Sequence, residues 1–204
     1  MIALDHIVIA SIDPKATAQA FAANMPAQVV QGGKHMSWGT WNWLCHFSND
    51  CYIEWIGIFD EHLARNSDNP LIQRVAKALI IDKKEGIIQF AFRTDQMDSL
   101  SQTLEKLGQS VKGPVPGSRS LPDGSKLEWR MLFTEADSAR PLPFFIEWGK
   151  KLPASESDLN SKSISSITVP ESAREHYEQL LGRDSTLTNT KLEYGKDFSF
   201  KITN

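Results

Sequence analysis

Two short stretches of the 204-residue sequence end in the same tripeptide, Ile-Glu-Trp, at residues 53–55 and 146–148. Upstream of each stretch lies a strand-like segment, which begins at Leu4 in one case and at Ile87 in the other. A repeated order of this kind indicates an internal duplication. It would place four side chains that can bind metal ions at equivalent positions of the two copies: His6, Glu54, Gln89 and Glu147.

These four side chains would supply one imidazole nitrogen, one amide oxygen and two carboxylates. Such donors suit a divalent metal with water completing an octahedron, and they are compatible with zinc, nickel, cobalt or manganese. A metal held in this way would polarise a substrate carbonyl and stabilise an enediolate. The four side chains are therefore compatible with a site for a divalent metal.

A metal-free interpretation of the same residues stays open. His6, on an apolar strand, could be a buried histidine with an ordinary partner, and Gln89 could simply form a hydrogen bond inside the fold. Two buried carboxylates repel each other, so without a metal one of them must be protonated or must pair with a cation. Arg130 and Arg93 are the cations that compete with a metal for the two glutamates.

Five side chains are candidates for substrate contacts: His35, Asn42, Trp43, Trp129 and Arg130. His35 follows two glycines, which permit a close approach of the backbone. Asn42 and Trp43 lie among several tryptophans, and such aromatic side chains could line an apolar pocket or simply pack in a core. Strand alternation puts Asn42 and Trp43 on opposite faces, and the sequence does not indicate which face lines the cavity. Turn chemistry and strand capping would explain His35 and Asn42 equally well.

The elements that would position these residues repeat the order strand, helix, strand, strand, strand. In the first module, residues 1–59, we expect a strand over residues 3–10 and a helix over residues 14–24. Asp13 is a good cap for this helix and Pro14 is a good first residue. The second module, residues 86–149, repeats the same order.

A linker and a third unit complete the expected domain organisation. Residues 60–85 predict a linker helix between the two modules, because apolar residues recur at helical spacing after Asn69 and Pro70. In the second module the same spacing predicts a helix from Asp95 to Leu107. Residues 150–204 predict a polar linker and a shortened third module, a strand, a helix and two strands, packed on the same domain.

Composition excludes several classes of function. The net charge of -3 and the pI of about 6.0 do not suit a nucleic-acid-binding protein, which normally carries a basic patch. No apolar run approaches the roughly 18 residues of a membrane span. The first residues lack the features of a signal peptide, so we expect a cytoplasmic protein in which Cys45 and Cys51 are free.

Paired modules of this order that close into a half-open barrel are typical of the vicinal oxygen chelate superfamily, which residues 1–149 resemble. Within it, the chain is similar to the glyoxalase-like domain branch. The first module carries this resemblance in Leu4-Asp5-His6, Gly32-Gly33-Lys34-His35, Gly39-Thr40, Asn42, Leu44 and Tyr52-Ile53-Glu54. The second module carries it in Arg119, Pro122-Asp123-Gly124, Trp129-Arg130, Pro143-Phe144 and Glu147.

The resemblance implies metal ligands on the first and last strands of each module, which here are His6 with Glu54 and Gln89 with Glu147. It also implies that Glu147 leaves the metal and moves a proton between adjacent carbons, as in glyoxalase I. Many members have a second histidine where this chain has Gln89. Without it the chain is a poor match to an extradiol dioxygenase, which needs two histidines and a carboxylate.

The sequence thus predicts an α+β fold, in which tandem βαβββ modules form a half-open mixed β-barrel with flanking helices and a shortened third module. The expected function is the binding of a small oxygen-rich molecule between the modules, with metal-dependent lyase or isomerase chemistry. The alternative is a metal-free protein of the bleomycin-resistance type that sequesters a small molecule. Modules of this kind can also pair between two chains, but the third module could cover the surface through which they pair. The sequence therefore leaves a homodimer open.

Overall fold

A computed structural model gives the positions of residues 1–120, 125–134, 142–150, 153, 159–182 and 186–203. Pro122-Asp123-Gly124, which forms part of the resemblance described above, lies outside these ranges, as does much of the linker that follows residue 150. Among the described residues, no helix is long and apolar enough to cross a membrane.

The first module has the order that the sequence predicts. Its elements are β1 (Ala3–Ala10), α1 (Pro14–Asn24), β2 (Val30–His35), β3 (Thr40–Phe47) and β4 (Cys51–Ile58). α1 begins at Pro14 because the Asp13 carboxylate accepts a hydrogen bond from the Ala16 N–H at 3.0 Å. Cys45 and Cys51 are free and buried, and burial raises the pKa of each thiol to about 12.

The second module repeats this order. Its elements are β5 (Gly86–Arg93), α4 (Met97–Lys106), β6 (Val111–Ser120), β7 (Lys126–Thr134) and β8 (Phe144–Trp148). α4 lies within the predicted helix and buries Met97 and Leu104 on one face, as the spacing of its apolar residues requires.

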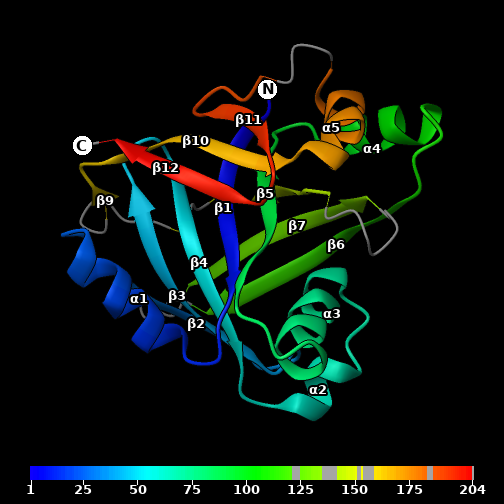
Figure 1. The fold of residues 1–204 in the computed structure, drawn as a ribbon. Helices are drawn as coiled ribbons and strands as arrows, with labels where there is room; N and C mark the ends of the chain where they lie inside the picture. The colour runs from blue at the N-terminus through cyan, green and yellow to red at the C-terminus, as the bar shows by residue number, and fades with distance from the viewer. Residues whose placement is uncertain (121–124, 135–141, 151–152, 154–158, 183–185, 204) are drawn as a thin grey trace.

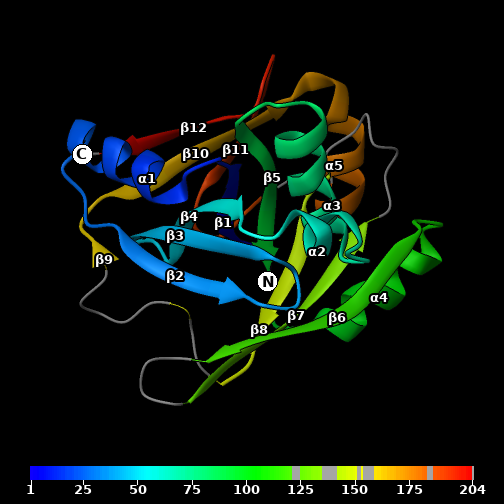
Figure 2. The same ribbon diagram turned by 90° about the horizontal axis from the view of Figure 1, so that it is seen from below.

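The eight strands of the two modules form one curved sheet in the order β2-β3-β4-β1-β5-β8-β7-β6. β1 pairs in parallel with β4 and β5 pairs in parallel with β8, while β1 and β5 join the modules by antiparallel pairing. Figures 1 and 2 show the sheet curling so that the β2–β3 and β6–β7 ends of the sheet turn toward each other. The half-open barrel of tandem modules is therefore confirmed.

The linker between the modules contains more than the single helix that the sequence predicts. α2 (Glu61–Arg65) precedes α3 (Pro70–Ala76), and a π-helical turn over Lys77–Ile81 continues α3. α3 starts after Asn69, whose side chain accepts a hydrogen bond from the Leu71 N–H at 2.9 Å. Figure 2 shows α2 and α3 between the β2–β3 pair and strands β6–β8, so the linker covers one end of the half-barrel.

The third module has the predicted strand, helix and two strands. It consists of β10 (Ser163–Pro170), a 3-10 turn over Glu171–Ala173, α5 (Arg174–Leu181), β11 (Lys191–Gly195) and β12 (Ser199–Thr203). β10 lies between β11 and β12 in a small separate sheet, which crosses over the main sheet in Figure 1. A short strand that the sequence does not predict, β9 (Leu159–Asn160), pairs in parallel with β3.

Alternating residues of the main sheet enter two apolar cores, one on each face. On the convex face, Trp55 of β4 belongs to a core that includes Ile167 of the third module. On the concave face, Ile56 of β4 belongs to a core that includes Ile72 of α3. Because side chains of a strand alternate between faces, Glu54 lies on the concave face with Ile56.

The shared convex core predicts that the third module unfolds together with the other two. Ile167 is 0% exposed, so Ile167→Ala should cost about 2–5 kcal/mol of unfolding free energy through lost burial and the cavity left behind. Ile81→Ala, at a side chain that is 67% exposed, should change stability little. Urea unfolding followed by circular dichroism measures both. A separate early transition in the Ile167→Ala variant would show that the third module folds independently.

Candidate functional site

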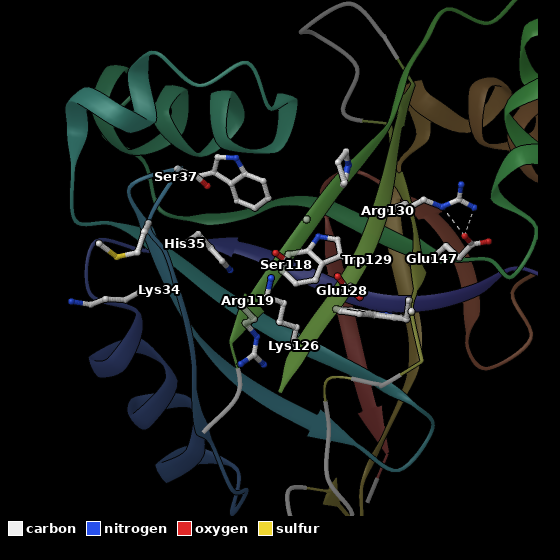
Figure 3. Close-up of a pocket in the computed structure, with 16 residues that line it drawn as sticks. Lys34, His35, Ser37, Ser118, Arg119, Lys126, Glu128, Trp129, Arg130 and Glu147 are labelled. Atoms are coloured by element: carbon white, nitrogen blue, oxygen red, sulfur yellow. Dashed lines mark hydrogen bonds and ion pairs between the residues drawn. The ribbon is translucent and has the colours of Figure 1, made fainter. Parts of the chain in front are cut away.

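The concave side of the half-barrel holds two connected cavities. An outer cleft of about 890 Å³ is lined by β2, β6, β7 and β8 and by the turn after β2. A small inner chamber of about 50 Å³ lies deeper, against β1, β3, β4 and α3. Five side chains line both cavities and form a neck between them: His35, Trp38, Arg119, Trp129 and Trp148. Figure 3 shows His35, Arg119 and Trp129 gathered at this neck.

Three polar side chains meet in the inner chamber: His6 of β1, Asn42 of β3 and Glu54 of β4. The Asn42 side-chain N–H donates to Glu54 Oε1 at 2.5 Å, and Asn42 Oδ1 accepts the Gly33 N–H at 2.7 Å. Glu54 Oε2 lies 3.5 Å from His6 Nε2. Since all three side chains are almost fully buried, they form a polar site inside an otherwise apolar cavity.

Asp5 fixes the orientation of the His6 ring. Its Oδ1 lies 2.7 Å from His6 Nδ1, and its Oδ2 accepts the indole N–H of Trp148 at 2.8 Å. An acid next to Nδ1 favours a hydrogen on that nitrogen, so the lone pair of neutral His6 is on Nε2, which faces Glu54. The Tyr52 ring stacks on His6 with 4.6 Å between ring centroids. His6 is thereby held for proton transfer through Nε2.

Two consecutive glycines of β2 make room for this arrangement. A Cβ atom on Gly32 would lie 2.0 Å from Asn42 Oδ1, and one on Gly33 would lie 2.7 Å from Arg119 Cδ. The pairing of β2 with β3 shifts register at the same place, between Gln31 and Lys34. The Gly-Gly pair thus allows Asn42 and the Arg119 stem to lie directly against the backbone.

Burial and neighbouring charges perturb the titrating groups around the neck. Burial lowers the pKa of Arg119, while the charges of Tyr52 and Glu54 act in the opposite direction. Burial also lowers the pKa of His35, opposed by Glu54 and assisted by Arg119. The pKa of Tyr52 is raised well above its ordinary value, first by burial and then by Asp5 and Glu54. The neck therefore combines a desolvated cation with a neutral imidazole.

The two Ile-Glu-Trp tripeptides are not structurally equivalent. In the β1–β5 pair, His6 lies opposite Ala91 and Val8 lies opposite Gln89. A twofold rotation that exchanges the two strands therefore makes His6 equivalent to Gln89. The same rotation makes Val8 equivalent to Ala91. Glu54 lies beside Val8, and the residue beside Ala91 is Phe144. The counterpart of Glu54 is therefore Phe144, and Glu147 is three residues further along. The expectation that the two glutamates face one cavity is wrong.

Glu147 lies on the opposite face of the sheet and pairs with Arg130. Its Oε1 accepts the Met97 N–H at the start of α4 at 3.1 Å, and its Oε2 accepts Arg130 Nε–H at 2.9 Å. Arg130 also binds Asp98 at 2.9 Å. In Figure 3 the Arg130–Glu147 pair lies apart from the residues of the neck, although both residues reach the rim of the outer cleft. The predicted catalytic carboxylate is thus engaged with an arginine, the competitor named above.

The residues present do not fit the four-ligand metal site that the sequence predicts. Glu147 is absent from the inner chamber, and Phe144 occupies the position equivalent to Glu54. The Gln89 side-chain N–H donates to the Leu142 carbonyl at 2.6 Å, while its Oε1 lacks a hydrogen-bond partner within the described ranges. No cluster of three or more His, Cys, Asp and Glu side chains that could hold a metal occurs among the described residues.

The predicted substrate contacts divide between the two faces. His35 and Trp129 lie at the neck and Asn42 lies in the inner chamber, whereas Arg130 reaches only the outer cleft. Trp43 is not brought to either cavity, because strand alternation places it on the convex face, where Lys15 lies over its ring. Its predicted contact with substrate is therefore not supported by its position.

The sequence analysis names Asp5, Tyr52 and Arg119 only as part of the family resemblance and assigns none of them to the site. Asp5 could have been recognised from the sequence, because it directly precedes His6 and a carboxylate often orients a functional histidine. Arg119 gave little signal, because it lies in a stretch of glycine, proline and serine that lacks the alternation of a strand.

Comparisons with known proteins agree with this architecture. The family model of the glyoxalase-like domain matches residues 4–184. A search of the curated proteins finds no match. Among solved structures, a hypothetical protein from Staphylococcus aureus covers 99% of this chain, and the chain covers 91% of it, at 17% identity with a TM-score of 0.78.

Two methylmalonyl-CoA epimerases are also similar in structure. The one from Mycobacterium tuberculosis has a TM-score of 0.53 at 18% identity, with 76% of this chain and 90% of that chain covered. The one from Streptomyces coelicolor, in complex with 2-nitronate-propionyl-CoA, has a TM-score of 0.53 at 20% identity, covering 71% and 96%. At these identities the likeness concerns the fold.

The lowered pKa of His35 predicts a loss of stability in acid. The unfolded chain takes up a proton at His35 near the ordinary pKa of 6.5, whereas the folded chain takes it up only at lower pH. Stability should therefore be full above about pH 6.5 and fall as the pH decreases below it. Urea unfolding between about pH 5 and 8 should show a smaller decrease for His35→Gln than for the wild type.

The exposed His62 provides the matched control, His62→Gln, which should keep the wild-type pH dependence. An unchanged pH dependence in His35→Gln would contradict the desolvated environment of this side chain.

Proposed function

Because the chain belongs to the glyoxalase-like domain family and has the fold of the vicinal oxygen chelate superfamily, we propose that it is an isomerase or lyase for a small oxygen-rich molecule. The molecule binds in the cleft between the two modules, and its reacting end enters the inner chamber. The observation that supports this proposal is the meeting of His6, Glu54 and Asn42 at the closed end of the chamber, with Asp5 behind His6.

Glu54 is the general base in this proposal. Its carboxylate takes a proton from a carbon next to a substrate carbonyl, while Asn42 holds the carboxylate in place through Oε1. Protonated His6 donates its Nε2 hydrogen to the carbonyl oxygen, so that a neutral enol forms in place of an enolate. When the carbon that loses its proton bears a hydroxyl, this enol is an enediol. Glu54 then returns the proton to the former carbonyl carbon while His6 takes the hydrogen of the other hydroxyl, which completes an isomerisation with no net change in the enzyme.

Asp5 acts on this chemistry through His6. It accepts the Nδ1 hydrogen of His6 and keeps Nε2 directed at Glu54, as a buried acid behind an imidazole does in other enzymes. The 3.5 Å between His6 Nε2 and Glu54 Oε2 places the acid and the base on one side of the chamber, within reach of two neighbouring substrate atoms. The base that the sequence predicts, Glu147, has no part in this scheme.

The metal-dependent form of this reaction, which the sequence predicts, would need zinc, nickel, cobalt or manganese on His6, Glu54, Gln89 and Glu147. Of these four side chains, only His6 and Glu54 line the inner chamber. We therefore propose that a proton on His6 polarises the substrate carbonyl. A cytoplasmic location and a homodimer both stay predictions.

Metal analysis tests this assignment directly. After incubation with each of the four metals and gel filtration, inductively coupled plasma mass spectrometry should find well below one metal per chain. His6→Ala and Glu147→Ala should leave this result unchanged. Stoichiometric metal that disappears in the His6→Ala variant would contradict the metal-free assignment and restore the predicted ligand at β1.

A sequestration protein is the second candidate function. Trp38, Trp129 and Trp148 line the outer cleft, and aromatic surfaces of this kind bind flat hydrophobic compounds. Such a protein would need the cleft but would not need the carboxylate of Glu54, and this difference separates the two candidates.

The proposed reaction predicts exchange of a carbon-bound hydrogen with solvent. In deuterium oxide, nuclear magnetic resonance should show loss of the α-hydrogen signal from one member of a panel of small 2-oxo and 2-hydroxy carbonyl compounds. Glu54→Gln should slow this exchange by about 10²–10⁴-fold, because it removes the base. Glu105→Gln, at an exposed position of α4, is the matched control and should keep the wild-type rate.

A flat aromatic compound that binds equally well to the wild type and Glu54→Gln, together with no exchange in the panel, would contradict the enzyme proposal. That pair of results would favour sequestration.

A further inference from the structure

One wall of the inner chamber comes from outside both modules. Leu71 and Ile72 of α3 line it, and these side chains are only 6% and 1% exposed. They are held in the first turn of the helix, because Asn69 caps it and Pro70 starts it. The linker therefore contributes directly to the surface that meets a ligand.

The chamber is divided into a polar part and an apolar part. His6, Asn42 and Glu54 form the polar part. Most of the other lining side chains are apolar, some of them aromatic. Six of the aliphatic ones come from four strands and α3: Leu44, Ile56, Leu71, Ile72, Met131 and Ile146. An aliphatic group of a ligand would lose its contact with water against these side chains, which is favourable by roughly 0.8 kcal/mol for each methylene.

The size of the chamber limits that aliphatic group. Its volume of about 50 Å³ corresponds to about three to five water-sized groups, at roughly 10–15 Å³ each. A short chain fits such a space, whereas a ring system or a long chain does not. The rest of any larger molecule would have to stay in the neck or in the outer cleft.

Arg119 gives the neck a positive charge beside this chamber. Its guanidinium is partly desolvated, and its stem lies against Gly33 of β2. No ion pair joins Arg119 to a carboxylate within the described part of the chain, although the charge of Glu54 acts on it. A desolvated guanidinium of this kind binds a carboxylate strongly, through hydrogen bonds that both charges reinforce.

We propose that the ligand is a short-chain 2-oxo carboxylate, with its carboxylate on Arg119 and its aliphatic chain against Leu71 and Ile72. This inference rests on the proposed function and specifies its substrate class. A ligand placed in this way has its 2-oxo group and the neighbouring carbon between the two anchors, beside His6 and Glu54. The hydrogen that Glu54 takes is then the one on C3, and His6 protonates the oxygen on C2, which gives an enol. Return of a proton to C3 exchanges that hydrogen with solvent, and a hydroxyl on C3 would allow the isomerisation.

Binding measurements test the two anchors without requiring catalysis. Pyruvate, 2-oxobutyrate, 2-oxovalerate and 2-oxohexanoate form a series of increasing chain length, and 2-oxobutyramide is an uncharged match to 2-oxobutyrate. Titrations followed by nuclear magnetic resonance of the tryptophan indole N–H groups should give the tightest binding for one of the shorter acids. The amide should bind at least about tenfold more weakly, because it lacks the charge.

Two variants and their controls assign the anchors. Arg119→Met should weaken binding of the acids by about tenfold or more and leave the amide unaffected, whereas Arg65→Met, at an exposed arginine of α2, should change neither. Ile72→Ala should shift the preference by about tenfold toward a longer acid, since it enlarges the chamber by several methylene volumes. Ile81→Ala, an exposed position, should leave the preference unchanged.

Equal binding of the acid and the amide to the wild type would overturn the inference even if Arg119→Met failed to fold. An unchanged chain-length preference in a folded Ile72→Ala variant would also overturn it. The proposed function is judged separately by hydrogen exchange. Arg119-dependent binding without exchange contradicts the reaction alone, and exchange on the amide as fast as on the acid contradicts the substrate class alone.

Discussion

The antiparallel pairing of β1 with β5 determines how the two modules meet, and the site depends on it. Because His6 lies opposite Ala91 and Val8 opposite Gln89, the concave faces of both modules turn toward one shared space. β4 and β8 then flank this central pair in parallel. A shift of one residue in the central pairing would turn the side chains of one strand to the other face, and the polar residues of β1 would leave the chamber.

This constraint explains which parts of the molecule the sequence could predict. Alternation and capping depend on local residues, so the strands of both modules and the start of α1 at Pro14 were predictable. The relation between the Ile-Glu-Trp tripeptides was not, because it depends on the register of β8 against β5. Two identical tripeptides suggested equivalence, but the pairing of Ala91 with Phe144 places the second glutamate on the other face. Arg119 was equally hidden, since its place at the neck depends on β2 approaching β6.

The buried carboxylates inside the half-barrel have short-range partners. Asp5 is satisfied by His6 and Trp148, with Arg93 at 3.8 Å, and Glu54 is satisfied by Asn42. Buried carboxylates without such partners would be strongly destabilising. Glu147 pairs with Arg130 on the opposite face of the sheet. The two glutamates therefore do not repel each other across a common cavity. The electrostatic argument for a metal, which began from two facing carboxylates, thereby loses its premise.

The position of α3 has a consequence for the orientation in which a ligand binds. Two identical modules would enclose a space with a twofold axis, and a ligand could enter it in either of two equivalent orientations. Leu71 and Ile72 come from a segment that has no counterpart in the duplication, and Phe144 replaces the second carboxylate. Together they abolish the twofold axis, so the two orientations of a bound ligand are no longer equivalent. Only one of them brings the reacting carbon to Glu54, and a chain assembled by duplication thereby has a single reacting end in its chamber.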